Sequence, residues 1–124
     1  MVPKPKVLVV DDEELNLDTF RRVFRKDLCM HLEVSPLAAL AAAGREYFDI
    51  ALVDYSMPEM NGVEFLTRLK AQNPNVDRVL VTAHIDLPDV RDASTSGLST
   101  AVIMKPWNKD DILGWIDRLM KKDP

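Results

Sequence analysis

The sequence contains few of the residues that mark a secreted or membrane-bound protein. It has one cysteine in 124 residues, which excludes an intrachain disulfide. No segment reaches the roughly 18 consecutive apolar residues that a membrane span needs, and the N-terminus lacks the apolar core of a signal peptide. We therefore expect a cytoplasmic protein that does not associate with membranes, in which Cys29 is a small buried residue without a catalytic role.

Excess positive charge is missing as well. Sixteen Lys and Arg residues stand against twenty Asp and Glu residues, which gives a net charge of −4. Because no overall positive field exists to gather phosphate backbones, we expect no nucleic-acid binding by this segment. The remaining composition, 47% hydrophobic and 29% charged, is typical of a globular protein. The length fits one domain, so we predict a single domain over residues 1–124 with a core at about 6–121.

Short apolar runs indicate buried strands. The runs are continuous rather than alternating, which is typical of parallel strands that are covered on both faces. A weaker, alternating segment at residues 31–34 predicts an edge strand. The four continuous runs are Val7–Val10, Ile50–Val53, Val79–Val81 and Ala101–Met104.

Between these runs the apolar residues recur at the spacing of a helix. The clearest stripe begins at Ile112, behind a predicted N-cap at Asn108, and Ser35 followed by proline predicts another helix start. Residues 86–97 form a weaker candidate, because their serines and threonine have low helix propensity. Five strands alternating with five helices predict the α/β class with a doubly wound parallel sheet.

Polar side chains directly follow four of the predicted strands. Asp11 and Asp12 follow the first continuous run, Asp54 the second, Thr82 the third and Lys105 the fourth. In open parallel sheets, ligands bind outside the carboxyl ends of the strands. We therefore expect these five side chains to lie on one rim of the sheet.

The chemistry of this rim suits phosphoryl transfer. Three carboxylates held together repel one another unless a cation is bound among them, and Mg²⁺ prefers such oxygen ligands. No cluster of His or Cys offers ligands for a softer metal. A carboxylate can act as a nucleophile toward phosphorus if the charge on the phosphoryl oxygens is neutralised. Lys105 supplies a compact positive charge and Thr82 a hydroxyl donor, so the set predicts a Mg²⁺-dependent phosphoryl-acceptor site.

Four segments at these strand ends recur in one known family. They are Val7-Leu8-Val9-Val10-Asp11-Asp12-Glu13, Leu52-Val53-Asp54 with Met57-Pro58 and Asn61-Gly62, Val81-Thr82-Ala83, and Lys105-Pro106. In this order and at these spacings, the chain resembles the receiver domains of the two-component response-regulator family over nearly its whole length. The resemblance implies a flavodoxin-like fold with strand order 2-1-3-4-5.

The resemblance also implies the roles of the acidic residues. Asp54 matches the aspartate that is phosphorylated. Asp12 matches a direct Mg²⁺ ligand, Asp11 a ligand mainly through water, and the backbone carbonyl of Ser56 would complete the protein ligands. These roles are expectations that come from the family.

The same comparison assigns the remaining site residues and shows one departure. Thr82 matches the hydroxyl residue that moves toward the phosphoryl group, and Lys105 matches the lysine that pairs with that group. The peptide bond from Lys105 to Pro106 is often cis in receivers, which an X–Pro bond permits at modest cost. Three residues before this lysine, many receivers carry an aromatic residue that swings inward on activation, whereas this chain has Val102. A valine cannot make that rotamer change, so the phosphorylation chemistry is expected to hold while the signal route differs.

The function implied is a phosphoacceptor switch. A sensor histidine kinase or a phosphotransfer protein would supply the phosphoryl group, and the chain would catalyse only its own phosphorylation and dephosphorylation. The signal would pass through the loop after the fourth strand to the face formed by the weak helix, the fifth strand and the last helix. A C-terminal output domain that lies outside this chain could be a further partner, and the sequence leaves open both homodimer formation and continuation past Pro124.

Two other functions compete with this one. A phosphatase of the haloacid-dehalogenase type also uses an aspartate, a hydroxyl residue, a lysine and Mg²⁺. Such enzymes need a longer chain, and their nucleophile follows the first strand in an Asp-x-Asp pattern that residues 11–13 lack. A receiver-like interaction module that is never phosphorylated is the second alternative. The intact set of acidic, hydroxyl and lysine residues argues against it, and Val102 favours it.

Overall fold

Strands and helices alternate along residues 3–121, the part of the chain that the computed structural model describes. Pro124 lies outside this range. Whether the native chain continues past it stays open. None of the helices within the described range is long and apolar enough to cross a membrane. The elements are β1 (Lys6–Val10), α1 (Glu14–Phe24), β2 (Cys29–Glu33), α2 (Pro36–Arg45), β3 (Ile50–Asp54), α3 (Gly62–Gln72), β4 (Asp77–Thr82), α4 (Pro88–Ser96), β5 (Ala101–Met104) and α5 (Lys109–Met120).

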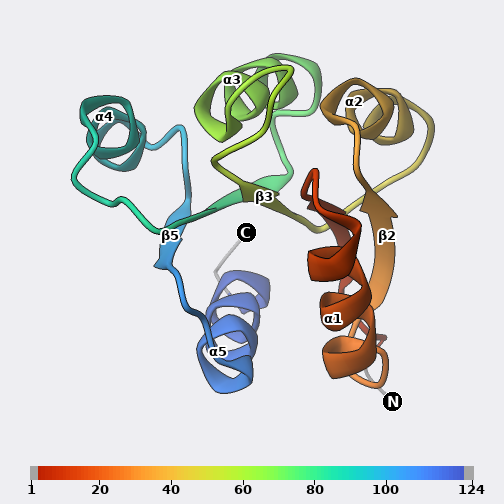
Figure 1. Ribbon diagram of the computed structural model, residues 1–124. Coiled ribbons are helices and arrows are strands. Elements are labelled where there is room, and N and C mark those ends of the chain that lie inside the picture. The colour runs from red at the N-terminus through yellow and green to blue at the C-terminus, as the bar shows by residue number, and fades with distance from the viewer. Residues whose placement is uncertain (1–2, 122–124) are drawn as a thin grey trace.

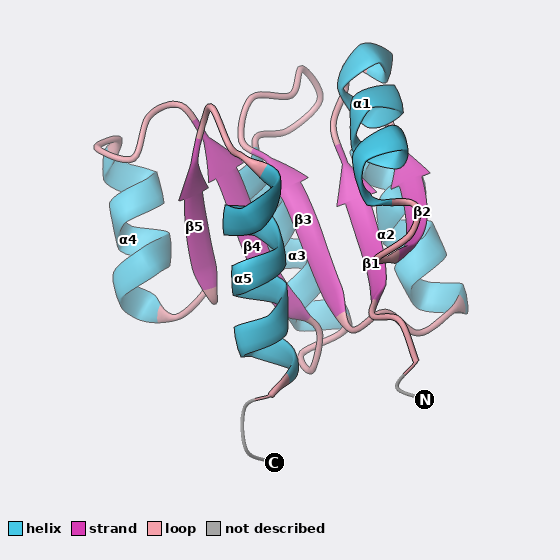
Figure 2. Cartoon of the chain, turned by 90° about the horizontal axis from the view of Figure 1, so that it is seen from below, coloured by secondary structure: helices cyan, strands magenta, loops and turns pink. Residues whose placement is uncertain are grey.

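The strands form one parallel sheet in the order β2-β1-β3-β4-β5. Figure 2 shows the five arrows pointing the same way, so the carboxyl ends of the strands lie at one edge of the sheet. The predicted class, sheet type and strand order are confirmed. The order reverses between β1 and β3, which is where ligands of such sheets bind.

Helices cover both faces of this sheet. Figure 1 shows α2, α3 and α4 on one face and α1 and α5 on the other. Alternate residues of β3 enter two separate cores: Ala51 and Val53 pack with the first set of helices, and Ile50 and Leu52 with the second. Because both faces of the strand are buried, its sequence reads as a continuous apolar run.

Side-chain caps fix the helix starts that the sequence predicts. The Ser35 hydroxyl accepts a hydrogen bond from the Ala38 N–H at 3.2 Å, and the Asn108 side chain accepts one from the Asp111 N–H at 2.8 Å. The weak helix is present as α4 and is capped by Gly97, whose φ of 81° is a left-handed conformation that favours glycine. It begins at Pro88 rather than at residue 86, because proline suits the first helical position, and its low-propensity residues lie inside the helix.

The edge strand differs from the prediction in its bounds and in one side chain. The predicted strand covers residues 31–34, whereas β2 begins at Cys29 and ends at Glu33. Cys29 is exposed, so the expectation of a buried cysteine is wrong. The physical reason is its place at the start of an edge strand, where the sheet has no further neighbour to cover it.

Gly62, the first residue of α3, lets the chain after Asp54 pass close to the strand that it leaves. A Cβ added at Gly62 would lie 2.8 Å from the Asp54 carbonyl oxygen and 2.9 Å from the Tyr55 Cα. We expect Gly62→Ala to lower the free energy of unfolding by about 2 kcal/mol, because the backbone must shift, and urea unfolding would measure this. At Gly114 in α5 a Cβ would meet nothing within 4 Å, so Gly114→Ala should raise stability by up to about 1 kcal/mol. Equal losses of unfolding free energy in Gly62→Ala and Gly114→Ala would contradict the view that Gly62 is needed for this close approach.

Candidate functional site

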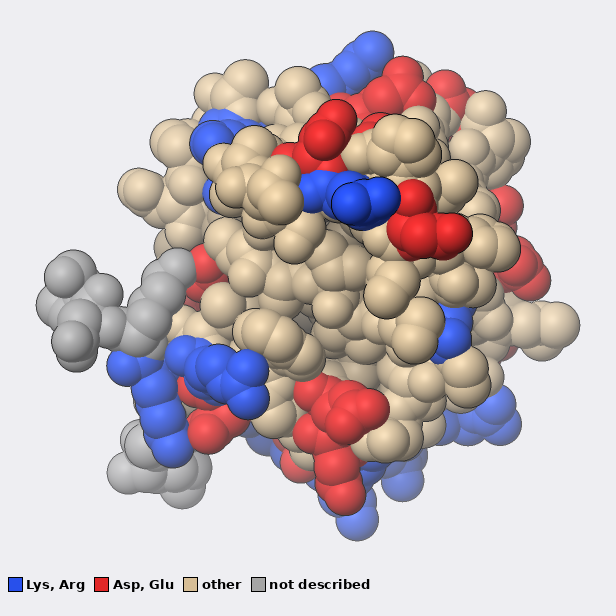
Figure 3. Space-filling view, turned by 90° about the vertical axis from the view of Figure 1, so that its left-hand side faces the viewer, with Lys and Arg blue, Asp and Glu red and all other residues tan. Residues whose placement is uncertain are grey.

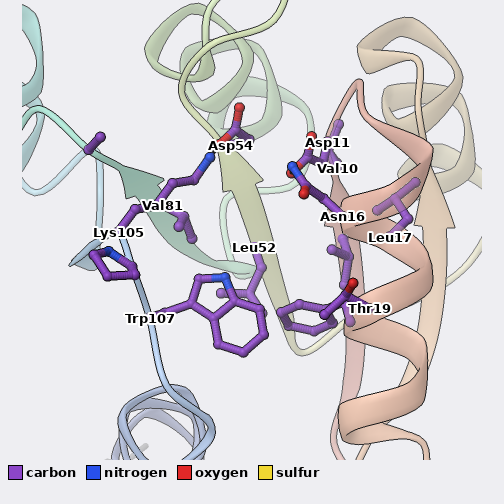
Figure 4. Close-up of a pocket in the computed structure, with 14 residues that line it drawn as sticks. Val10, Asp11, Asn16, Leu17, Thr19, Leu52, Asp54, Val81, Lys105 and Trp107 are labelled. Atoms are coloured by element: carbon purple, nitrogen blue, oxygen red, sulfur yellow. Dashed lines mark hydrogen bonds and ion pairs between the residues drawn. The ribbon is translucent and has the colours of Figure 1, made fainter.

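The predicted rim is formed by the ends of four neighbouring strands. Asp11 and Asp12 follow β1, Asp54 ends β3, Thr82 ends β4 and Lys105 follows β5. Figure 4 shows Lys105 reaching toward Asp54 from one side, with Asp11 on the other. The fold therefore brings together residues that are up to 94 positions apart, from 11 to 105 in the sequence.

The three acidic residues form a cluster. Asp11, Asp12 and Asp54 each offer a carboxylate oxygen, and these oxygens lie within 4.8 Å of one another. The Asp11 carboxylate is held in place by the Glu13 N–H at 3.0 Å and by the Asn16 side-chain amide at 3.1 Å. The start of α1 thus orients the acidic side chain next to Asp54.

Asp54 is the buried member of the cluster, with 7% of its surface exposed, and its Oδ1 forms an ion pair with Lys105 Nζ. Burial raises the pKa of the Asp54 carboxyl, because the charged form loses water. The hydrogen bond from Lys105 opposes this rise, whereas the negative charges of Asp11 and Asp12 add to it. The folded protein therefore disfavours the charge on Asp54 in the absence of a further cation.

Removal of this charge should stabilise the fold at neutral pH. Because the Asp54 pKa is raised on folding, stability is lost as pH rises from the ordinary carboxyl pKa of about 4 through the raised value. Asp54→Asn should therefore unfold at a higher urea concentration than the wild type at pH 7 without Mg²⁺. The difference should disappear as pH falls below about 4, where the wild-type carboxyl is protonated in both states. A variant that is less stable at pH 7 would contradict this account.

Thr82 lies on the rim but is bonded to its own loop. It is buried, with 2% of its surface exposed. Its Oγ1 accepts a hydrogen bond from the His84 N–H at 3.0 Å, and its carbonyl oxygen accepts one from the Lys105 N–H at 2.8 Å. Since Oγ1 is an acceptor in this arrangement, its own O–H remains available to donate. The structure brings Thr82 beside Lys105, and its role toward a phosphoryl group stays a prediction.

The loop after β3 carries the last predicted ligand. Ser56 is exposed two residues past Asp54, and the role of its carbonyl oxygen stays a prediction. At the other side of the rim the Lys105–Pro106 peptide bond is cis, as the resemblance implied.

A cavity of about 460 Å³ opens beside the Asp54–Lys105 pair and extends along α1. Trp107 forms one wall, as Figure 4 shows. Its ring centroid lies 5.5 Å from that of Phe20 and 5.6 Å from that of Phe24, distances typical of favourable aromatic pairs. These contacts fix the segment that follows Lys105, so the lysine leaves a supported backbone.

The donor set at the rim fits Mg²⁺. All of the clustered side-chain donors are carboxylate oxygens, which are the ligands that this hard cation prefers. With three carboxylates and one lysine, the rim has a formal charge of −2, which one divalent cation would balance. Asp11, Asp12 and Asp54 are the side chains that would hold the ion.

The structure adds two contacts around the predicted rim. Asn16 lies in the first turn of α1 and its side-chain amide donates to the Asp11 carboxylate, a role that its position behind an acidic pair could have suggested. Tyr55 directly follows Asp54, and its hydroxyl donates a hydrogen bond of 2.8 Å to Asp89 Oδ2 on α4. Nothing in the sequence connects these two residues, because they are 34 positions apart.

Comparisons with known proteins agree with this geometry. The family model for the response regulator receiver domain matches residues 7–117. Sporulation initiation phosphotransferase F from Bacillus subtilis is 30% identical over 108 residues, which cover 86% of this chain and 86% of that protein. The hydrogenase transcriptional regulatory protein HoxA from Cupriavidus necator and the alginate biosynthesis transcriptional regulatory protein AlgB from Pseudomonas aeruginosa are longer, and this chain spans 22% and 24% of them.

Solved structures share the fold. A CheY-like response regulator receiver domain protein from Methanospirillum hungatei JF-1 has a TM-score of 0.86 at 27% identity, with 96% of each chain covered. The receiver domain of the sensor histidine kinase PA1611 from Pseudomonas aeruginosa PAO1 has a TM-score of 0.85 at 20% identity, covering 97% of this chain and 100% of that chain. In that protein a magnesium ion is coordinated in the active site cleft.

Proposed function

This chain belongs to the response regulator receiver domain family, and we propose that Asp54 is the residue in it that accepts a phosphoryl group. Receiver domains are signalling modules of two-component systems, and phosphorylation on an aspartate is general to the family. One observation carries the assignment: Asp54 is buried at the centre of the rim, paired with Lys105 and within 4.8 Å of the acidic oxygens of Asp11 and Asp12.

We propose a transfer step that uses three side chains. A carboxylate oxygen of Asp54 attacks the phosphorus of a phosphohistidine, so that an O–P bond forms and the P–N bond breaks. The imidazole leaves with the electron pair of that bond and takes up a proton. Lys105, now paired with Asp54 Oδ1, moves to a phosphoryl oxygen, and the Thr82 O–H donates to another.

Mg²⁺ is the proposed cofactor of this step. Receiver domains bind Mg²⁺ at an acidic pocket, and the clustered carboxylates of this chain form such a pocket. We propose that Asp12 and Asp54 hold the ion directly, Asp11 mainly through water, and Ser56 through its backbone carbonyl. When bound, the ion supplies positive charge that offsets the charge of the phosphoryl oxygens.

The partners follow from the family. Receiver domains interact with histidine kinases or phosphotransfer proteins. We propose that such a partner supplies the phosphoryl group in the cytoplasm, and that the single receiver domain of this chain catalyses only its own phosphorylation and dephosphorylation. An output domain elsewhere in the full protein fits the longer relatives, and whether the domain forms a homodimer stays open. With a net charge of −4, the segment itself is proposed to bind neither nucleic acid nor membranes.

We propose that the output surface is the side formed by α4, β5 and α5. Figure 3 shows this side, on which charged side chains lie above and below a central region of uncharged ones. Ile85 before α4 and Met104 at the end of β5 are 47% and 53% exposed. Exposed apolar residues next to each other can bury apolar area against a partner.

The experiment that tests the assignment is incubation with acetyl phosphate and Mg²⁺, followed by intact-mass measurement. The wild type should gain one phosphoryl group, and removal of Mg²⁺ by a chelator should prevent the gain. Asp54→Asn should gain none. Asp92→Asn, at an exposed aspartate of α4, is the matched control and should react as the wild type does.

Intact mass and an assay of phosphomonoester hydrolysis together separate the alternatives. No gain of mass, under conditions that phosphorylate another receiver domain, would favour the module that is never phosphorylated. Rapid repeated hydrolysis of small phosphomonoesters would favour the phosphatase. The family match argues against the phosphatase beforehand, as does the position of Asp54 at the end of β3 rather than β1.

A further inference from the structure

If phosphorylation of Asp54 is to alter α4, some contact must connect the two. The resemblance places a mobile aromatic residue where this chain has Val102, and valine cannot make the large rotamer change. Val102 instead borders a groove of about 370 Å³, together with Val90 of α4 and Met104 of β5. The short valine side chain leaves this space open, so coupling to α4 requires another residue.

Tyr55 has the required connections. Its backbone N–H donates to the Val81 carbonyl at 2.9 Å, and its own carbonyl accepts from the Gly62 N–H at 2.7 Å. These two bonds fix the backbone of Tyr55 between β4 and the start of α3. From this fixed position the side chain reaches α4, where its hydroxyl donates to Asp89 Oδ2 at 2.8 Å. The residue next to the acceptor thus touches the output helix directly.

Asp89 is placed where its bond to Tyr55 can control the start of α4. It is the second residue of the helix, and the N-cap residue Leu87 makes no side-chain capping bond. A first-turn carboxylate commonly serves the free N–H groups of its own helix, but here it is engaged by Tyr55. The hydrogen bond to Asp89 shifts the pKa of the Tyr55 hydroxyl upward, as expected for a donor to a carboxylate.

The other end of α4 is fixed differently. The buried Arg78 side chain donates from Nε to the Leu98 carbonyl at 2.7 Å and from Nη2 to the Gly97 carbonyl at 3.4 Å. The C-terminal end of α4 is therefore tied to the start of β4 by charged hydrogen bonds, which are stronger than neutral ones. The start of α4 is held by Val90, which is buried in the core, and by the Tyr55–Asp89 hydrogen bond. Opening of that bond therefore loosens the first turn, while Arg78 keeps the other end in place.

We propose that the Tyr55–Asp89 hydrogen bond is a latch that phosphorylation of Asp54 opens, releasing the start of α4. The inference rests on the proposed function of Asp54. A phosphoryl group draws the Thr82 hydroxyl toward it, and Thr82 is the last residue of β4, directly before the loop that leads into α4. Because the Tyr55 backbone is held in place, movement of this loop separates Asp89 from the Tyr55 hydroxyl.

Hydrogen exchange of residues 88–96, with and without beryllofluoride and Mg²⁺, tests the latch. In the wild type, exchange should rise at least about tenfold on beryllofluoride addition, the population change that loss of one hydrogen bond to a charged group gives. In Tyr55→Phe, exchange should already be fast and should change by less than about twofold. Asp89→Ala should behave in the same way, and the double variant should add nothing further.

The other tyrosine of the chain provides the matched control. The Tyr47 hydroxyl donates to Asp49 Oδ1 at 2.9 Å, so Tyr47→Phe removes the same kind of bond away from α4. This variant should respond to beryllofluoride as the wild type does. All variants should still gain one phosphoryl group from acetyl phosphate.

The outcomes separate the latch from the acceptor. An exchange response in Tyr55→Phe that equals the wild-type response would overturn the latch and leave Asp54 as the acceptor. Failure of the wild type itself to gain a phosphoryl group would overturn the proposed function, and the latch with it.

Discussion

Replacement of Lys105 by methionine is expected to slow phosphorylation from acetyl phosphate by about 10²- to 10³-fold, the usual cost of losing one positioned donor to developing negative charge. Lys105 Nζ is already paired with Asp54 Oδ1, so it stands where the charge of the transferring group develops. Methionine keeps much of the length of the lysine side chain and removes the charge. Rates of phosphoryl gain by intact mass would measure the loss.

The same variant should bind Mg²⁺ more tightly. The lysine charge repels Mg²⁺ from the carboxylates of Asp11, Asp12 and Asp54, which lie together at the rim. Its removal leaves their negative charge without a neighbouring positive side chain, so Mg²⁺ is attracted more strongly. Isothermal titration calorimetry with Mg²⁺ would measure the increase in affinity. Phosphorylation and metal affinity should therefore move in opposite directions, which general damage to the site would not produce.

Lys109→Met is the matched control for this pair of effects. Lys109 lies four residues further on, is 49% exposed, and pairs with Asp27 at 3.3 Å. Its replacement removes one lysine charge without touching the rim, so the phosphorylation rate should stay within about twofold of the wild type. A Lys105→Met protein that is phosphorylated at the wild-type rate would refute the role given to Lys105.

The rim could be predicted from the sequence because, in a parallel sheet, the position of a residue directly after a strand already tells at which edge of the sheet it lies. Residues that follow buried parallel strands meet at one edge of the sheet, so Asp54 and Lys105 could be placed together although they are 51 positions apart. The ion pair itself could not be predicted, because it depends on the side-chain direction that the Trp107 contacts and the neighbouring loop set.

Side-chain contacts between elements could not be predicted from the sequence either, because they too depend on side-chain direction in the folded chain. Tyr55 and Asp89 each suit a surface position, and their hydrogen bond exists because the Tyr55 side chain reaches from the loop after β3 to the first turn of α4. Cys29 shows the converse case: its residue type favours burial, yet the edge position of β2 exposes it. Residue type alone does not report which strand lies at the edge.

Arg78 is the residue that the sequence concealed most completely. The apolar run that predicts β4 begins at Val79, so Asp77 and Arg78 read as a charged pair in the preceding loop. In the structure both belong to β4 and are buried, with 7% and 6% exposure. Burial lowers the pKa of the Arg78 guanidinium, and the charge of Asp77 opposes this. A charged group in such a place requires hydrogen-bond partners.

Those partners are backbone carbonyl oxygens from two loops. Nη1 donates to Val76 at 2.6 Å and to Pro74 at 3.3 Å, before β4. Nε and Nη2 donate to Leu98 and Gly97, after α4. The planar fork of an arginine can serve several acceptors at once, so this one side chain joins the start of β4 to the end of α4.

Arg78→Met is therefore expected to lower the free energy of unfolding by about 3–5 kcal/mol, the range for breaking a buried charged network. The buried Val76 carbonyl oxygen and the partly buried carbonyl oxygens of Pro74, Gly97 and Leu98 lose their donor, and methionine offers none in return. Urea unfolding monitored by circular dichroism would measure the change.

Arg78→Lys should recover only part of the loss, because a single ammonium cannot reach the carbonyls of both loops. Arg68→Met, at an exposed site on α3, should change stability by less than about 0.5 kcal/mol. If the Arg78 and Arg68 variants lost equal stability, the joining role of Arg78 would be wrong.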